Sequence, residues 1–417
     1  MSAKLVRAPS LIRPLGAYLP RPELAANVIA PPYDSLTVQE TRGLVTENPL
    51  SFLNVLRSEI DAPERTKADR LAMLTDAAVR LRELLAGEIF DFYEPPVFFV
   101  CRLELDGRAQ TGVVADVSLE AYEAGLVRVH ESTRRGQEDR LVEYLNIVRA
   151  SILPVFLIHR LSAAVDGAVA AAAAEAPVID VNADDGLRMS VWVVDDPADV
   201  AQMGRALAGL EELYIADGHH RVAASRRSAA ARATANPECA DEPYTHVVSV
   251  LFSADQLIIH PYNRCVRDLG GCSAEELLAA IRSSFEVREL PRGAPPASPG
   301  EFSLHLNGRW YQVTAPARLR EVEGAAGLDV AILHDHLLRP LLGIDDPRTD
   351  ARIEFVPDTL GLGELERLCD EGYAVAFALH PMGVDELMDV ADCGEQMPPK
   401  STWFAPKLRS GLVVRLL

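Results

Sequence analysis

Apolar residues recur at helical spacing along several stretches of the chain. Between residues 67 and 85 they fall three or four positions apart, as at Leu71, Leu74 and Ala78, and this period predicts an amphipathic helix. Ser273 followed by Glu276 is the capping-box pattern of a helix start. Further helices are predicted over 139–150, 163–176, 200–210, 222–235, 328–341 and 384–390.

Apolar runs separated by turn-forming pairs predict strands between these helices. The run 97–105 is followed by Asp106-Gly107 and by a second run, 110–117, which together predict a hairpin. Asp185-Gly186 and Asn307-Gly308 predict two more hairpins. Further strands are predicted over 151–159, 210–216, 246–253, 256–263, 352–356 and 373–379.

This succession of helices and strands predicts a mixed α/β (α+β) protein. A chain of 417 residues is long enough for two or three structural units. We expect an N-terminal α+β region over 1–125, a central core over 126–270 and a C-terminal α+β region over 271–417. No repeat of fixed period is visible in the sequence, which argues against solenoids and propellers.

Composition and charge narrow the class of protein. Hydrophobic residues make up 48% of the chain, and 41 Lys and Arg face 61 Asp and Glu, a formal net charge of −20. Such an acidic chain does not favour binding to a nucleic-acid backbone. No apolar run approaches the roughly 20 residues that span a membrane. We therefore expect a cytoplasmic protein with neither a nucleic-acid nor a membrane partner.

The most informative short motif is Asp217-Gly218-His219-His220-Arg221, which lies where a predicted strand ends and a predicted helix begins. Free N–H groups and the positive end of a helix meet at such a position. Gly218 permits a left-handed turn, and the three following side chains are donors suited to phosphate oxygens. Two solvated histidines at a helix start would fit the spacing equally well. The carboxylate of Asp217, which suits Mg²⁺ or a hydroxyl, favours a phosphate site.

A second cluster is His130-Glu131-Ser132-Thr133. It is not the H-E-x-x-H zinc motif, because the fourth residue after His130 is Arg134. Glu131 is a candidate general base toward a hydroxyl, and His130 and Thr133 are candidate substrate-binding residues. The alternative is that Glu131 is an exposed residue beside Arg134.

A third candidate lies near the C-terminal end, where residues 394–401 have the Walker A spacing except that Pro399 replaces the second glycine. Proline lacks the N–H that a phosphate loop needs, so this segment is not a P-loop. Lys400 is a candidate contact to a phosphate or to a substrate carboxylate, the alternative being a solvated lysine.

Six strings in a fixed order resemble one known family: VIAPPYD, NPLSFLNV, HEST with the DRL that follows, YIADGHHR, LDVAILHDHLL and MPPKSTWFAPKL. They extend from about residue 10 to the C-terminus. On these motifs the chain is identified as a member of the prokaryotic domain-of-unknown-function family numbered one thousand and fifteen.

The Asp-Gly-His-x-Arg turn is also similar to the nucleotide-phosphate loop of the ParB/sulfiredoxin-like fold, including the free L-serine kinases built on it. In those kinases the turn meets the phosphates of ATP or ADP, and an upstream glutamate deprotonates the serine hydroxyl. The resemblance implies a ParB/sulfiredoxin-like core over 126–270. Asp217, Gly218, His219 and Arg221 match the loop, and His220 occupies its variable position. Glu131 is the positional match for the base, across a longer spacing than in the compact kinases.

The resemblance further implies an ATP-dependent small-molecule kinase that uses ATP or ADP with Mg²⁺, and whose acceptor is free L-serine or a related hydroxy amino acid. Glu131, Asp217 and His219 would be the catalytic residues, and Asp217 would hold the metal. The carboxylate of the acceptor would need a cation, for which the candidates are Lys400, Arg264 and Arg57.

Two other functions fit the same loop. One is a non-catalytic nucleotide-binding regulator of ParB type, and the other is an ATP-dependent ligase. The acceptor, the choice between ATP and ADP, and the oligomeric state do not follow from the sequence.

Overall fold

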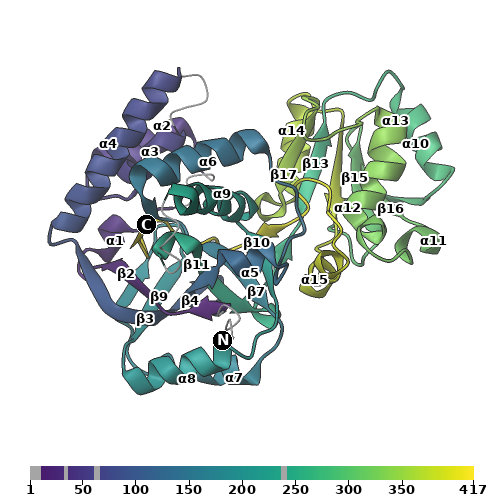
Figure 1. Cartoon of the computed structure of the whole chain (residues 1–417). Coiled ribbons are helices and arrows are strands. Elements are labelled where there is room, and N and C mark those ends of the chain that lie inside the picture. The colour runs from purple at the N-terminus through teal and green to yellow at the C-terminus, as the bar shows by residue number, and fades with distance from the viewer. Residues whose placement is uncertain (1–10, 32–35, 61–65, 236–241) are drawn as a thin grey trace. The chain divides into compact units, whose positions relative to one another are not determined.

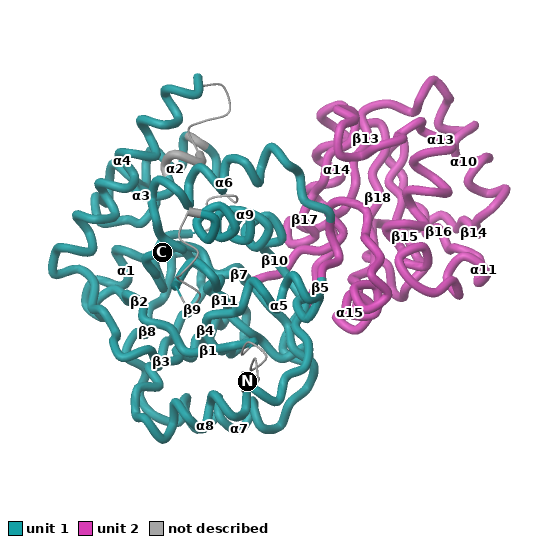
Figure 2. The backbone as a smooth tube through the Cα atoms, in the orientation of Figure 1, with its two compact units in different colours: residues 1–128, 132–257, 406–417 teal, residues 129–131, 258–405 magenta. Residues whose placement is uncertain are grey.

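The computed structural model describes residues 11–31, 36–60, 66–235 and 242–417, and the chain divides into two compact units (Figures 1 and 2). Unit 1 comprises Met1–Arg128, Ser132–Leu257 and Pro406–Leu417. Unit 2 comprises Ile258–Ala405 and the short stretch Val129–Glu131. Most of unit 2 is therefore an insertion within the chain of unit 1.

Unit 1 is built on a mixed sheet of ten strands in the order β5-β10-β7-β11-β4-β3-β9-β8, with β1 added to β4 and β2 to β3. The pairs β5·β10 and β7·β11 are parallel. A separate short pair joins β6 to β20. The strands are β1 Ile12–Arg13, β2 Leu15–Pro20, β3 Phe90–Leu105, β4 Arg108–Ser118, β5 Val127–Arg128, β6 Ala150–Ser151, β7 Val155–His159, β8 Ile179–Asn182, β9 Arg188–Val194, β10 Leu213–Asp217, β11 His246–Ser253 and β20 Arg415–Leu416.

Helices pack on this sheet with caps and apolar faces that the sequence encodes. In α4, Thr66 and Asp69 form a capping box, and the helix buries Leu74, Leu81 and Leu84. Helix α9 packs on β7 and β11, and α6 packs on α9 (Figure 1). The helices are α1 Ala25–Val28, α2 Val38–Glu47, α3 Leu53–Ile60, α4 Lys67–Ala86, α5 Leu119–Glu123, α6 Arg135–Val148, α7 Ala163–Ala172, α8 Pro197–Leu207 and α9 His219–Ala235.

Unit 2 has its own antiparallel sheet of six strands, in the order β14-β16-β15-β18-β13-β17. Its strands are β12 Ile259–His260, β13 Tyr262–Val266, β14 Glu286–Leu290, β15 Glu301–Leu306, β16 Arg309–Thr314, β17 Ile353–Pro357, β18 Val375–Leu379 and β19 Trp403–Phe404. Its helices are α10 Ala274–Arg282, α11 Ala317–Arg320, α12 Asp329–Leu333, α13 Arg339–Leu342, α14 Leu362–Asp370 and α15 Val384–Asp392, with a π-helical turn over His334–Leu338 between α12 and α13.

The mixed α/β class is confirmed, and so are the hairpin turns. Asp106 and Gly107 have φ of 52° and 74° between β3 and β4, and Asn307 and Gly308 have the same two values between β15 and β16. Left-handed backbone at both central residues is what a two-residue hairpin turn needs. Gly186 likewise has a positive φ, 83°, between β8 and β9.

The units group the chain differently from the three regions expected over 1–125, 126–270 and 271–417. Strands β3 and β4 of the first expected region share one sheet with β7, β10 and β11 of the second. The last twelve residues, 406–417, also belong to unit 1. The physical reason is long-range strand pairing, because β4 pairs with β11 along seven consecutive residues.

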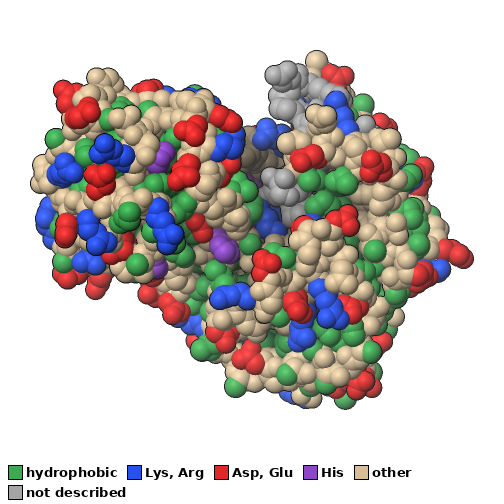
Figure 3. Space-filling model, turned by 180° about the vertical axis from the view of Figure 1, so that it is seen from behind, with side chains coloured by type: hydrophobic (Ala, Val, Ile, Leu, Met, Phe, Trp, Pro, Cys, Tyr) green, Lys and Arg blue, Asp and Glu red, His purple; other side chains and the backbone are tan. Residues whose placement is uncertain are grey.

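No helix in the described part of the chain is both long enough and apolar enough to cross a membrane. On the face shown in Figure 3, acidic and basic side chains are interspersed with hydrophobic ones.

Candidate functional site

The loop 217–221 of unit 1 lies at the junction of a buried strand and a long helix. Residues Leu213–Ala216 of β10 are fully buried, and the strand ends at Asp217 after a register shift against β7. Gly218 has φ of 112°, a conformation that residues with a Cβ rarely adopt. Helix α9 then begins, and Val222 N–H donates to the Gly218 carbonyl at 3.0 Å. The turn therefore connects a buried strand directly to the N-terminal end of a 17-residue helix.

Arg221 braces this loop from within unit 1. Its Nη2 donates to Asp217 Oδ2 at 3.1 Å, and its Nη1 donates to the carbonyls of Leu153 and Pro154. A Cβ built on Gly218 would lie 3.0 Å from the guanidinium carbon. The side chain predicted as a phosphate donor thus also ties Asp217 and the turn to the segment between β6 and β7.

The two histidines of the motif differ in environment. His219 is buried, at 5% exposure, whereas His220 is half-buried. His220 Nε2 accepts a hydrogen bond from Arg134 N–H at 2.9 Å, so its ring proton resides on Nδ1. Burial lowers the pKa of His220, and the imidazole is therefore neutral near neutral pH.

The segment that follows His130 and Glu131 is linked to helix α9 by Glu138 of α6. Thr133 Oγ1 donates to Glu138 Oε1, and Arg227 Nη1 of α9 donates to Glu138 Oε2 at 2.9 Å. The Thr133 hydroxyl and Arg227 together hold the pKa of Glu138 below its usual range. Helices α6 and α9 and the segment before α6 therefore form one bonded network in unit 1.

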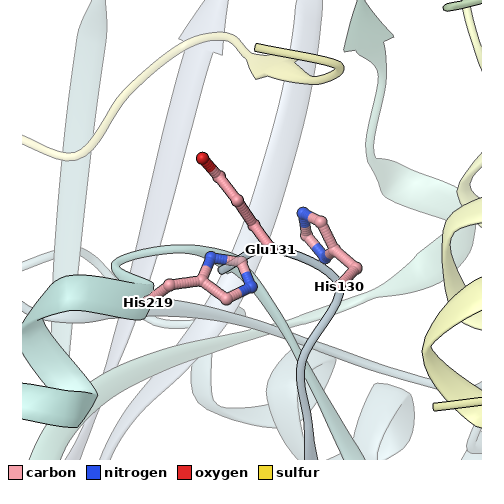
Figure 4. A group of neighbouring side chains, drawn as sticks. All are labelled: His130, Glu131 and His219. Carbon is pink, nitrogen blue, oxygen red and sulfur yellow. The ribbon is translucent and has the colours of Figure 1, made fainter. Parts of the chain in front are cut away.

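His130 and Glu131 lie in the stretch Val129–Glu131, between β5 and this network. Figure 4 draws both side chains on that stretch and the His219 side chain at the start of α9. Met397 N–H donates to the His130 carbonyl at 2.9 Å, both residues belonging to unit 2. The residues on either side of this stretch are bound to unit 1. Arg128 pairs with Tyr214 of β10, and the Arg134 N–H donates to His220.

Two predicted cations, Arg264 and Lys400, lie together in unit 2. Arg264 of β13 is 3% exposed, and its Nη2 donates to the Lys400 carbonyl at 2.9 Å and to the Pro399 carbonyl at 3.4 Å. Lys400 has φ of 55°, and its Nζ lies 5.1 Å from the centre of the Tyr262 ring. Arg264 and Lys400 thus lie side by side within unit 2, whereas the loop 217–221 belongs to unit 1. The Arg57 side chain lies outside the described residues.

Sequence reasoning missed the residues that connect the loop to its surroundings. Arg134 bonds to His220, which is 86 positions further along the chain, and Glu138 bonds to Arg227, which is 89 positions further along. The only local signal was the spacing of Thr133 and Glu138 at the start of a predicted helix. Their partners on α9 follow from the packing of α6 on α9.

An apolar pocket lies beside the loop within unit 1. Arg221 and Ser225 of α9 form one wall, and the rest is mainly apolar. It is lined by Leu56, Leu141, Tyr144, Leu145, Ala150, Ser151, Ile152, Leu153, Arg221, Ser225 and Val247. The pocket thus offers an apolar surface with the polar side chains of Arg221 and Ser225 on one side.

The class that fold and site define is a two-unit mixed α/β protein with a glycine turn at a helix N-terminus. The family model described as protein of unknown function DUF1015 matches residues 12–331. The chain belongs to this family, as its motifs predicted. A search of curated proteins found no match.

Similar solved structures are distant in sequence. A C-terminally truncated SbnI from Staphylococcus aureus has 11% identity and a TM-score of 0.38, covering 71% of this chain and 84% of its own. A free serine kinase variant in complex with AMP has 13% identity and a TM-score of 0.35, covering 70% and 87%. A conserved hypothetical protein from Pyrococcus furiosus has 13% identity and a TM-score of 0.34, covering 71% and 92%. At these scores the likenesses do not assign a function.

Proposed function

We propose that this protein is an ATP-dependent small-molecule kinase that phosphorylates free L-serine to O-phospho-L-serine. The observation that carries the proposal is the turn 217–221, with a left-handed glycine at the N-terminus of α9 and a carboxylate beside it. Its sequence also resembles the phosphate loop of the free serine kinases. The proposal includes a ParB/sulfiredoxin-like nucleotide-binding core in unit 1.

The loop suits phosphate oxygens through its backbone. The first N–H groups of α9 have no partner inside the helix, and the helix dipole favours an anion at that end. Because Arg221 is engaged with Asp217 and with two carbonyls, we assign it mainly to holding the turn in shape. The neutral His220 and the buried His219 complete the wall of the proposed phosphate site.

In the proposed reaction, the serine hydroxyl oxygen attacks the γ-phosphorus of ATP, and the bond from that phosphorus to the β-phosphate oxygen breaks. ADP leaves, and the hydroxyl proton passes to the Glu131 carboxylate. Chain continuity supports this role for Glu131. It is three residues from Arg134, which is bonded to His220, and three residues span at most about 11 Å.

The residues present also fit a magnesium ion. Asp217 is 45% exposed at its side chain, and one carboxylate oxygen, Oδ2, accepts from Arg221. A single carboxylate beside nucleotide phosphates is a common way of holding Mg²⁺. When bound, the ion would supply positive charge to the phosphates during transfer.

The test is ³¹P NMR of the full chain with Mg²⁺, a pool of hydroxy amino acids and either ATP or ADP. A new phosphomonoester signal is expected, and omission of single acceptors names the substrate. Glu131→Gln should lower the rate by about 10²- to 10⁴-fold, because it removes the base, while nucleotide binding persists. Glu120→Gln, an exposed residue of α5, is the matched control and should keep the wild-type rate.

Two results would replace the proposal with an alternative. Nucleotide binding without any turnover, for every acceptor tried, would indicate a ParB-type regulator. ATP consumption that yields an amide product would indicate a ligase. Unchanged phosphoserine formation by Glu131→Gln would remove Glu131 from the role of base.

A further inference from the structure

Unit 2 contains a cavity that the phosphate loop does not use. It is bounded by the start of β13, the end of β18, the turn before β15, and helices α11, α12 and α15. The charged side chains that line it are Arg264, Arg320, Asp329 and Glu386. The remaining wall is largely apolar, with Tyr262, Leu328 and Leu379 among its residues.

Arg264 brings a buried positive charge to this cavity. Its Nη1 donates to the carbonyls of Tyr262 and Asn263, and its Nη2 to those of Pro399 and Lys400. All four partners are neutral, and no carboxylate among the described residues forms an ion pair with the guanidinium. Burial lowers the pKa of Arg264 to about 9.

Asp329 brings a negative charge to the same cavity. Its Oδ1 accepts from Gly300 N–H at 2.7 Å, and no described side chain hydrogen-bonds to the carboxylate. The Arg320 side chain packs over Gly300, where a Cβ would lie only 1.9 Å from Arg320 Cδ. Burial and the nearby Glu386 carboxylate raise the pKa of Asp329 to about 7.

Asp329 and Arg264 line the same cavity, and no ion pair joins them in the described part of the chain. The hydrogen bonds of both groups go to the main chain instead. Arg320, which also lines the cavity, is the cation that lowers the pKa of Asp329. A ligand that carries both a positive and a negative group would therefore find an acid and a cation on one cavity wall that do not bind each other.

We propose that this cavity binds a free α-amino acid as a zwitterion, with its ammonium group on Asp329 and its carboxylate on the Arg264 side. The wall of apolar residues would exclude water from the two charge-assisted contacts. This inference rests on the proposed function in one respect, the choice of L-serine as ligand. It goes beyond that function by assigning unit 2 a ligand site of its own.

The test is isothermal titration calorimetry of the full chain, with and without ADP, against three ligands that share a hydroxyl. L-Serine carries both charges, ethanolamine lacks the carboxylate, and 3-hydroxypropionate lacks the ammonium. We expect L-serine to bind and each truncated ligand to bind about tenfold more weakly or worse, because one charge-assisted contact is lost. This comparison needs no substitution and so carries no folding risk.

Asp329→Asn tests the ammonium contact directly. The amide keeps an oxygen for Gly300 N–H but loses the charge, so the affinity for L-serine should fall about tenfold or more. Asp385→Asn is the matched control, because Asp385 is an exposed acid on α15 that does not line the cavity. Arg318→Gln on α11 is the second control, beside the cavity-lining Arg320.

Each outcome decides one proposal without deciding the other. The cavity assignment is overturned if no amino acid binds the wild-type chain, if the three ligands bind equally, or if Asp329→Asn keeps the wild-type affinity. Phosphoserine formation by the wild-type chain, together with calorimetric L-serine binding that is unchanged in Asp329→Asn, would overturn the cavity and leave the kinase standing. Serine binding that depends on Asp329, without any phosphorylated product, would do the reverse.

Discussion

Each unit contains an arginine that is only 3% exposed, and the two arginines have different hydrogen-bond partners. In unit 1, Arg415 is 3% exposed and donates to the carboxylate of Asp116, which is 2% exposed, at 2.7 Å. In unit 2, Arg264 is also 3% exposed but donates only to main-chain carbonyls. Buried charges are normally paired because desolvation penalises them.

The difference distinguishes a buried charge that stabilises the fold, Arg415, from one that we assign to ligand binding, Arg264. The pair of Arg415 with Asp116 joins two opposite charges, and it links strand β20 to β4 of the main sheet. Arg264 holds the turn at Lys400 but leaves its charge without an acidic partner among the described residues. In the same unit, Asp329 is an acid without a basic hydrogen-bonding partner in the described residues. We interpret a buried charge without an oppositely charged hydrogen-bond partner as part of a site where a ligand supplies that partner.

The largest expected effect on stability comes from breaking the ion pair between Arg415 and Asp116. Arg415→Met leaves Asp116 buried with only the longer contact to Arg13, 3.5 Å away. We expect the free energy of unfolding to fall by about 4 kcal/mol, as measured by chemical denaturation of the full chain.

Two further variants sharpen this result. The double variant Asp116→Leu with Arg415→Met removes both charges and should recover most of the loss. Arg264→Met leaves no buried carboxylate behind and should lose only about 2 kcal/mol, from its carbonyl contacts. An equal loss for Arg264→Met and Arg415→Met would contradict the distinction between the two arginines.

A second prediction concerns the pH dependence of stability. The pKa of Asp329 rises from 3.8 in the unfolded chain to about 7 in the folded one, so the folded state binds its proton more tightly. Stability from this group is therefore present at low pH and is lost as the pH rises from about 4 through 7. We expect Asp329→Asn to be more stable than the wild type at about pH 8, by on the order of 3 kcal/mol.

The same comparison at low pH is the control. At about pH 4 the wild-type carboxyl is protonated in the folded state, and the two proteins should unfold at nearly the same denaturant concentration. Stabilisation by Asp329→Asn of the same size at both pH values would show that the charge of Asp329 is not its cause. Saturating L-serine should abolish the advantage of the variant at high pH.

The smallest effect on stability is expected for a substitution in the phosphate loop of unit 1, where Arg221 is paired with Asp217. Gly218→Ala places a Cβ on backbone with φ of 112° and 3.0 Å from the Arg221 guanidinium. The strain costs about 1 to 2 kcal/mol, and the affinity for ADP should fall about tenfold, as measured by calorimetry.

Gly167→Ala is the matched control for this substitution. Gly167 lies inside α7, and an added Cβ would meet no atom within 4 Å. The change should leave ADP affinity unaltered and stabilise the protein slightly, by about 0.5 to 1 kcal/mol. Wild-type ADP binding by Gly218→Ala would separate the turn from nucleotide binding.

Much of the fold could be predicted because its signals are local. The Asp106-Gly107 and Asn307-Gly308 pairs specified hairpin turns that the backbone adopts. The start of β3 could not be predicted in this way. The strand is expected from residue 97 but begins at Phe90, so it runs across Pro95 and Pro96. Prolines argue against a strand in any local reading. Here the extra length pairs with β2, a partner distant in sequence.

The candidate site divides in the same way. The turn at Gly218 and the helix after it follow from adjacent residues, and the structure has both. The hydrogen bonds from Arg221 to the carbonyls of Leu153 and Pro154 do not follow from adjacent residues, because those carbonyls lie 68 and 67 positions away. The charged cavity of unit 2 was likewise invisible, because Arg264 and Asp329 come together only when β13 and α12 pack in one unit.

The return of the C-terminal segment to unit 1 also has a consequence for synthesis on the ribosome. Tyr18 forms a β-bridge with Val414, and β6 pairs with β20. Unit 1 therefore cannot complete these pairings until residues 406–417 have been made, and residues 258–405 of unit 2 precede them in the chain. Residues 258–405 can pair their own sheet before that point, because the six strands of that sheet all lie within this stretch.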